Sequence, residues 1–185
     1  MKGKDFEKLC LYQLDREEKA GHLSAGRYGV QATYRDEQWQ PIDSLPDIEG
    51  DLAPDARHFI FDCKVCRAAS FPLDDDKFEK RQKRHLYRRA RVGAITFLLI
   101  HFPERQLKKR TDEELTVAFP VHPGHPFWET VDRGEVKRIQ RQDCEEYGVR
   151  VAWSEGRGNP RPDLLPAIRA VSERLTECQD MVASW

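Results

Sequence analysis

Two aspartates and a lysine lie close enough in the sequence to share one site. Asp47 is separated from Asp62 and Lys64 by residues 53–56, Ala-Pro-Asp-Ala, a composition that favours a tight turn because Pro54 fixes φ. A hairpin symmetric about this turn places Asp47 opposite Asp62, with Cβ atoms roughly 4.5–5.5 Å apart, and points Lys64 to the same face. Two carboxylates so placed repel each other, so the pattern indicates a cation between them.

Carboxylate oxygens of this kind suit Mg²⁺ and the hydrolysis of a phosphodiester. Mg²⁺ takes one or two carboxylates together with waters and substrate phosphate. A bound ion lowers the pKa of a water and stabilises charge on the cleaved phosphate, and a neighbouring lysine can position or deprotonate that water. The other face of the strand carries Phe59, Phe61 and Cys63, which are typical of core. A surface turn with scattered charges is the alternative, because Asp-x-Lys is a common triplet.

A strongly basic segment follows. Acidic residues 74–76 favour the start of a helix, which the sequence predicts over Lys77–Arg91. Eight cationic side chains accompany one acidic residue, Glu79, in this segment. Such charges repel one another, and a polyanion relieves the repulsion and releases counterions. Because the whole chain is balanced, with 31 Lys and Arg against 32 Asp and Glu, this concentration favours nucleic-acid binding over a solvated helix face.

Length and composition predict one domain over residues 1–185. No apolar run reaches ~18 residues, so no membrane span is expected. The first residues lack the apolar stretch of a signal peptide. Five cysteines without framework spacing are consistent with a reducing cytosol, so a cytoplasmic protein is expected.

Periodicity predicts an α/β domain built on a mixed sheet. Helices are expected at 3–18, 77–91, 136–147 and 163–180, where Asp163 can cap the last one. Gly21 and residues 24–26 are expected to end the first helix. Strands are expected at 28–34, at 44–64 as the hairpin, at 93–102 as a buried central strand, and at 149–153. A further strand at 115–121 is predicted at an edge because it contains Pro120. Residues 35–46 and 156–162 are expected to be connections.

In their order and spacing these motifs resemble the RecU-type Holliday-junction resolvases, members of the restriction-endonuclease-like nuclease superfamily. The chain departs from them in carrying Asp62 where glutamate is more usual, and in its short, acidic-leaning 34–46 segment where they have a long basic stalk. The resemblance rests on Gly3-x-x-Phe6-Glu7, Asp47-Ile-Glu-Gly50, Phe61-Asp62-Cys63-Lys64, Phe71-Pro72-Leu73, Gln82-x-x-His85, Gly93–Phe102, Phe127-Trp128, Glu145–Gly148 and Pro160–Asp163.

The resemblance implies a restriction-endonuclease-like core, with a mixed β-sheet flanked by helices, and a Mg²⁺-dependent endonuclease. Asp47, Asp62, the backbone carbonyl of Cys63 and Glu7 would bind Mg²⁺, which Mn²⁺ could replace. Lys64 would orient or activate the water, and Gln82 would orient the water or a phosphate. Taken alone, Glu7 is better explained as a solvated helix residue, and Gln82 equally well as a surface one. The residues implied to hold the DNA backbone are Lys80, Arg81, Lys83, Arg84, Arg88 and Arg89.

The implied substrate is branched DNA, above all the four-way junction, nicked symmetrically by a homodimer encoded by a bacterium or phage. Two alternatives stay open. One is a non-catalytic DNA-binding recombination protein on the same fold. The other is a repair nuclease that acts on duplex or flap DNA, which the missing stalk keeps in consideration.

Overall fold

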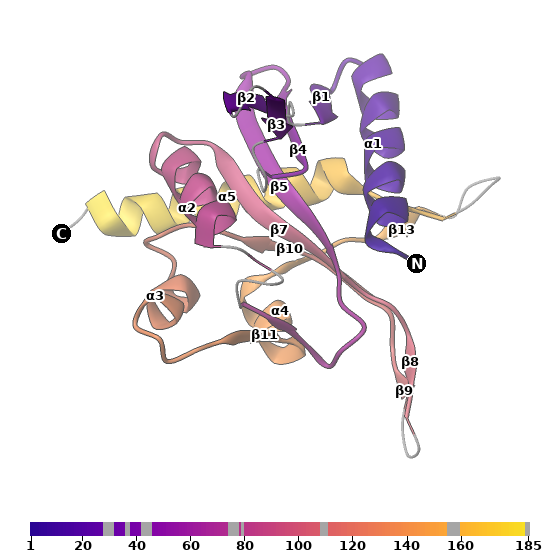
Figure 1. Cartoon of the computed structure of the whole chain (residues 1–185), viewed down its shortest axis with the longest axis vertical. Coiled ribbons are helices and arrows are strands. Elements are labelled where there is room, and N and C mark those ends of the chain that lie inside the picture. Colours follow the sequence, from indigo (N-terminus) through magenta and orange to yellow (C-terminus); the bar gives the residue numbers. More distant parts are fainter. Residues whose placement is uncertain are drawn as a thin grey trace.

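A six-stranded mixed sheet forms the centre of the computed structural model (Figure 1). Its strands, in spatial order, are β1 (Leu23–Arg27), β4 (Ile48–Leu52), β5 (Arg57–Val65), β7 (Ile95–Phe102), β10 (Leu115–Pro120) and β12 (Val149–Arg150). Strands β5 and β7 are parallel, and the other neighbours are antiparallel. The structure describes residues 1–27, 32–35, 38–41, 46–73, 78, 80–107, 111–154 and 160–183; of 32–35, 38–41 and 178–183 it describes the backbone only.

One face of the sheet is covered by α1 (Gly3–Lys19) and α5 (Leu164–Ala183). Alternate residues of the central strands point to this side, as the two-residue period of a strand requires. The apolar stripe predicted for the last helix is buried here. The main contacts come from Phe6, Cys10, Leu14, Phe59, Phe61, Cys63, Phe97, Leu99, Leu164, Leu165, Ile168, Val171 and Leu175.

The other face is covered by α2 (Lys80–Arg91), α3 (Pro126–Asp132) and α4 (Arg141–Tyr147), together with a ribbon of β6 (Ser70–Pro72) and β11 (Arg138–Gln140). Helix α2 turns Leu86 and Ala90 inward at helical spacing, and both are fully buried. The two faces together bury β5 and β7 on both sides. This confirms an α/β fold in which helices flank a mixed sheet.

Three further ribbons lie outside the central sheet: β2 (Ala32–Arg35) with β3 (Gln38–Pro41), β8 (Arg105–Gln106) with β9 (Thr111–Asp112), and β13 (Trp153–Ser154) with β14 (Arg161–Pro162). The β8–β9 ribbon projects as an arm from the ends of β7 and β10 (Figure 1). Arg105 pairs with Asp112 across it.

The helices predicted at 3–18 and 163–180 are confirmed, and so is the buried central strand β7. Other expectations were wrong. Residues 24–26 lie in β1, because they pair with β4. Part of the 35–46 connection is strand, β3 with the end of β2. Strand β10 is internal, with Pro120 at its end, and the helix predicted over 136–147 is divided between β11 and α4.

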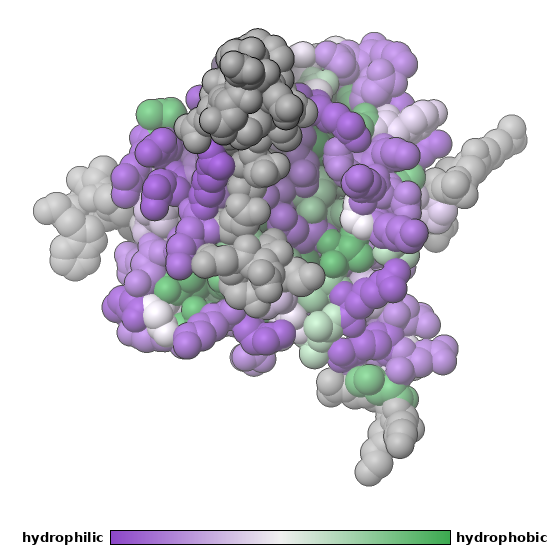
Figure 2. Space-filling view, in the orientation of Figure 1, coloured by the Kyte–Doolittle hydropathy of each residue, from purple (hydrophilic) through white to green (hydrophobic). Residues whose placement is uncertain are grey.

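Some predicted features lie outside the described residues: the acidic start at 74–76, Lys77 and Glu79 of the basic helix, residues 28–31 of a predicted strand, and residues 155–159. Within the described part of the chain, no helix is long and apolar enough to cross a membrane. Hydrophilic side chains cover most of the face seen in Figure 2, with apolar areas between them.

Candidate active site

The predicted hairpin and its register are present. Strands β4 and β5 pair with Glu49 opposite Ile60 and Asp51 opposite His58, across the turn at residues 53–56. The last paired residues are Ile48 and Phe61. One step further in the same register places Asp47 opposite Asp62.

Asp62 is fully buried on the face of β5 that α2 covers. Its Oδ2 lies 2.6 Å from Lys64 Nζ, yet neither oxygen has a partner of hydrogen-bonding geometry among the described residues. Burial raises the pKa of Asp62 well above its usual range; Lys64 opposes the shift and Asp47 adds to it. The fold therefore holds a carboxylate in a place where its charge is poorly stabilised by the protein itself.

Asp47 is held beside this carboxylate by a backbone contact. The Cys63 N–H donates to Asp47 Oδ2 at 2.7 Å. A strand residue points its N–H and its C=O to the same edge, so the Cys63 carbonyl faces the side where Asp47 lies. The Cys63 thiol points the other way, into the core beside α1.

Gln82 belongs to the same site and is not a surface residue. It is 7 % exposed and lies on the inner face of α2. Its Oε1 is 3.5 Å from Lys64 Nζ, a long hydrogen bond. An uncharged side chain from the basic helix is thus directed at the lysine of the Asp62-x-Lys64 pair.

Glu7 occupies a different setting. Its Oε1 lies 3.0 Å from Nη2 of Arg27 on β1, and the side chain is largely buried. Among the described residues, no contact joins Glu7 to Asp47 or Asp62. Its role as a metal ligand remains a prediction.

The donor set suits a hard cation with few protein ligands. Among the described residues, no three His, Cys, Asp or Glu side chains are gathered as a metal-binding group. Asp47, Asp62 and the Cys63 carbonyl make a smaller set, which matches the one or two carboxylates that usually hold Mg²⁺. The buried Asp62 oxygens, which lack donors, would gain most from a cation.

The cations of α2 divide into exposed and engaged groups. Lys83 Nζ pairs with Asp132 on α3 at 2.8 Å, and Tyr87 donates a hydrogen bond to the same carboxylate. Arg89 is half-buried, with no hydrogen-bond partner for its Nε among the described residues. The exposed cations, on the side away from the sheet, are Lys80, Arg81, Arg84, Arg88 and Arg91.

Two kinds of residue were missed by reasoning from the sequence. Gly50 is required by packing, because a Cβ there would lie 2.2 Å from the Ser24 oxygen and 2.5 Å from the Phe59 ring. The sequence signal for Gly50 was its spacing from Asp47. The packing that requires a glycine depends on β1, which was not predicted. Arg67 and Arg138 line the same hollow beyond the end of β5. No local pattern links them, because the pairing of β6 with β11 brings Arg138 there.

Comparisons with known proteins find a weak likeness among solved structures. No family model matches the chain, and no curated protein matches it. A solved structure of Hjc, a Holliday junction resolvase from the archaeal hyperthermophile Archaeoglobus fulgidus, is similar at 19 % sequence identity and a TM-score of 0.48. The match covers 80 % of this chain and 95 % of that one. A likeness of this strength says nothing about the side chains of the site.

Proposed function

We propose that the protein is a metal-dependent, structure-selective DNA endonuclease that nicks four-way junctions symmetrically. One observation carries the proposal: Asp62 is fully buried opposite Asp47, and its one charged partner among the described residues is Lys64, at 2.6 Å and outside hydrogen-bonding geometry. A fold gains no stability from such a carboxylate. Its retention next to a lysine is the arrangement expected of a catalytic metal site.

Mg²⁺ is the proposed cofactor, and Mn²⁺ is expected to replace it. Asp47, Asp62 and the Cys63 carbonyl would hold the ion, and we include Glu7 as a fourth ligand from α1. When bound, such an ion supplies a water of lowered pKa and a counter-charge for the cleaved phosphate. The chain must also exclude competing water from Asp62, which burial under α2 does.

Lys64 and Gln82 would act on the attacking water. Lys64 Nζ lies between the Asp62 carboxylate and the Gln82 amide, at 2.6 Å and 3.5 Å. A lysine held from two sides has a restricted position, which favours orientation of a water over mere charge balance. Gln82 also links the site to the basic helix, so DNA bound along α2 would be aligned with the cleavage centre.

We propose that α2 holds the DNA backbone through Lys80, Arg81, Lys83, Arg84, Arg88 and Arg89. The strongest support is for Arg84 and Arg88, which are exposed opposite the buried stripe of the helix. Lys83 would have to share its charge with Asp132. Phosphate contacts of this kind position DNA without selecting sequence.

The preference for four-way junctions rests on the sequence resemblance to RecU-type resolvases. Symmetric nicking of two strands requires two sites related by a two-fold axis, so we propose a homodimer. The segment at 34–46 is too short to fill a junction centre. We therefore expect weaker discrimination among branched DNAs than a long-stalked relative would give.

The deciding experiment compares a four-way junction, a flap and a linear duplex of equal length, with and without Mg²⁺, for the wild type and Asp62→Asn. We expect symmetric nicking of the junction only with Mg²⁺, and a loss of at least ~10³-fold in the variant. Mg²⁺ should also raise the melting temperature of the wild type and not of the variant, which tests the metal site without cleavage.

Each other outcome has a distinct meaning. Cleavage by Asp62→Asn at the wild-type rate would reject the metal site. Junction binding without cleavage in Mg²⁺ or Mn²⁺ would favour the non-catalytic recombination protein. Equal affinity for junction and duplex in Mg²⁺-free buffer, with a monomeric mass by light scattering, would reject the resolvase and leave a duplex or flap nuclease.

A further inference from the structure

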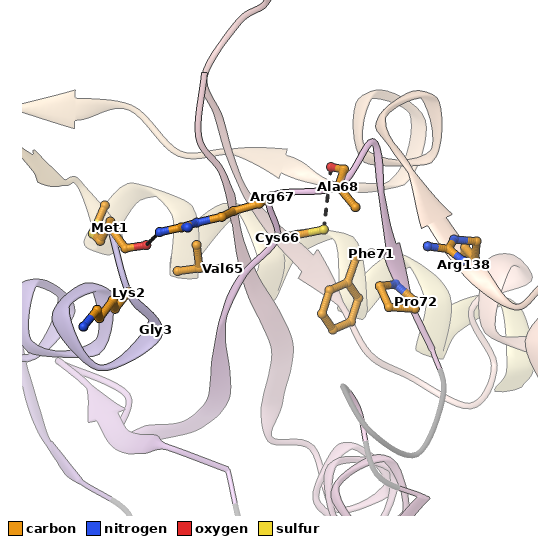
Figure 3. A pocket seen from close by; sticks show the side chains of 10 residues that line it. All are labelled: Met1, Lys2, Gly3, Val65, Cys66, Arg67, Ala68, Phe71, Pro72 and Arg138. Atoms are coloured by element: carbon orange, nitrogen blue, oxygen red, sulfur yellow. Dashed lines mark hydrogen bonds between the residues drawn. The ribbon is translucent and has the colours of Figure 1, made fainter. Parts of the chain in front are cut away.

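A hollow of about 670 Å³ opens where β5 ends, beyond the candidate active site (Figure 3). It lies between the first turn of α1 and the β6–β11 ribbon. Val65 and Arg67 form its back, Lys2 lies on the α1 side, and Pro72 and Arg138 lie on the ribbon side. Residues from four separate elements thus converge on one space.

Among the described residues, the charged side chains that line the hollow are all basic: Lys2, Arg67 and Arg138. Arg67 donates to the Met1 carbonyl at 3.3 Å, and Arg138 donates through Nε to Ser70 Oγ at 2.8 Å. A guanidinium carries several N–H donors, so these bonds orient both groups and leave donors for a phosphate. The three side chains are exposed, which keeps them accessible to a ligand.

The wall between these cations is apolar. Val65 and Pro72 are half-buried, Ala68 is exposed, and Phe71 lies behind them in the core. Figure 2 shows an apolar area, bordered by hydrophilic side chains, near the N-terminal end of α1. An apolar wall with a cationic rim matches a nucleotide, which presents a flat base and a charged phosphate.

The hollow is next to the site along a single strand. The Val65 side chain lies on the α1 side of the sheet and Lys64 on the α2 side, but Cys66 and Phe71 of the α2-side core also line the hollow, so it spans the end of the strand. A strand rises about 3.3 Å per residue, so Arg67 lies within about 10 Å of Lys64. A DNA strand carries one phosphate per about 3.4 Å of helix axis. Nucleotides next to a phosphodiester placed at Asp62 therefore lie within reach of the hollow.

We propose that this hollow binds an unpaired nucleotide of the DNA strand that flanks the cleaved phosphodiester. Arg67 and Lys2 on the α1 side and Arg138 on the ribbon side would hold the phosphates that flank it, and Val65 and Pro72 would contact its base. Bases are available to such a wall only where pairing is interrupted, as at a branch. This inference rests on the proposed nuclease function and extends it, because the hollow would favour branched DNA without a stalk.

The test measures binding in buffer with EDTA, so that it does not depend on cleavage. The ligands are a four-way junction and a linear duplex of equal length, each with 2-aminopurine at one position, next to the branch in the junction. We expect Arg67→Gln/Arg138→Gln to lower junction affinity by about tenfold or more, and duplex affinity by less. Wild-type binding should raise the fluorescence of the junction probe, and the double variant should not.

Two further variants keep the result interpretable. Ala68→Glu places an acid in the hollow and should give the same loss. Arg16→Gln, a matched charge change on exposed α1 surface about 20 Å along the helix from Gly3, should stay within about twofold of wild type. Melting temperatures of all variants should be close to that of the wild type.

The outcomes separate this inference from the proposed function. Unchanged junction affinity in the double variant and in Ala68→Glu, with cleavage in Mg²⁺ intact, would reject the nucleotide site in the hollow. The proposed nuclease function would stand. Equal losses of affinity for junction and duplex, with no fluorescence response, would reject the proposal that the bound nucleotide is unpaired. A wild type that cleaves nothing but shows the expected binding differences would retain the hollow and reject the nuclease.

Discussion

The two faces of strand β5 are both buried, but they bury different chemistry. Toward α1 and α5, Phe59 and Phe61 pack in an apolar core, and Phe61 stacks on Phe97 with ring centroids 4.5 Å apart. Toward α2, the next residue, Asp62, is equally inaccessible, and Lys64 at 2.6 Å is its one charged partner among the described residues. One face therefore stabilises the fold, and the other gives up stability where the proposed chemistry needs a charge.

Replacing Phe61 and replacing Asp62 should change the free energy of unfolding in opposite directions. Phe61→Ala removes a fully buried ring and should lower the free energy of unfolding by about 3–5 kcal/mol. Asp62→Asn keeps the volume and removes the buried ionisable carboxyl, and Lys64, whose side chain is 20 % exposed, keeps Gln82 and solvent as partners, so the change should raise that free energy by about 1–2 kcal/mol in metal-free buffer. Urea denaturation measures both. A destabilised Asp62→Asn would contradict the comparison.

The gain from Asp62→Asn should depend on pH. The pKa of Asp62 is raised in the folded state, so above the unfolded value of 3.8 the folded protein holds a proton that the unfolded chain loses. Wild-type stability contributed by this group therefore falls as pH rises. The advantage of the variant should vanish near pH 3.8 and grow toward neutral pH. A constant difference across this range would reject the raised pKa.

Close packing on the apolar face of the sheet predicts a loss of stability when a side chain is added at Gly50. Gly50 lies opposite Phe59, and an added Cβ would meet the Ser24 backbone oxygen at 2.2 Å. Because backbone must shift, Gly50→Ala should cost about 2–3 kcal/mol. Gly26, on the paired strand β1, has nothing within 4 Å of an added Cβ, so Gly26→Ala serves as the control. Equal denaturation midpoints for the two variants would contradict the crowding.

His101 shows how the apolar face accommodates a titratable group. Its Nδ1 lies 3.0 Å from Thr116 Oγ1, and its ring stacks on Phe6. Burial lowers the pKa of His101 to about 4, from 6.5. The unfolded chain thus binds a proton first, so stability present above pH 6.5 is lost as pH falls toward 4, by about 3 kcal/mol at most.

His101→Gln tests this by removing the titration. Urea midpoints at pH 7, 5.5 and 4.5 should fall more steeply in the wild type than in the variant, although the variant is less stable at pH 7. His125, whose pKa is also lowered to about 4 by burial, contributes to the slope that remains. Identical slopes would show that His101 does not titrate in the folded protein.

Features of the fold and the site were predictable where the sequence signal for them was local. The register that places Asp47 opposite Asp62 was predictable because the turn at residues 53–56 and the alternation of the strands fix it. The burial of Asp62 was not, because it depends on α2 folding over a strand that β7 and β4 enclose. Gln82 could be assigned to the site only through the family resemblance. Strand β1 was missed, since its short polar sequence gains strand structure only by pairing with β4.

The smallest effect concerns the outer side of α2, which covers the polar face. If the exposed Arg84 and Arg88 each contact one phosphate, the slope of log affinity against log salt on duplex DNA should fall by up to ~2 in Arg84→Gln/Arg88→Gln. Arg16→Gln, at an exposed position of α1, is the control because it lies outside the proposed DNA surface. Its slope should match that of the wild type. Titrations in EDTA at several salt concentrations measure the slopes of the wild type, the double variant and the control. An unchanged slope in the double variant would contradict DNA binding along α2.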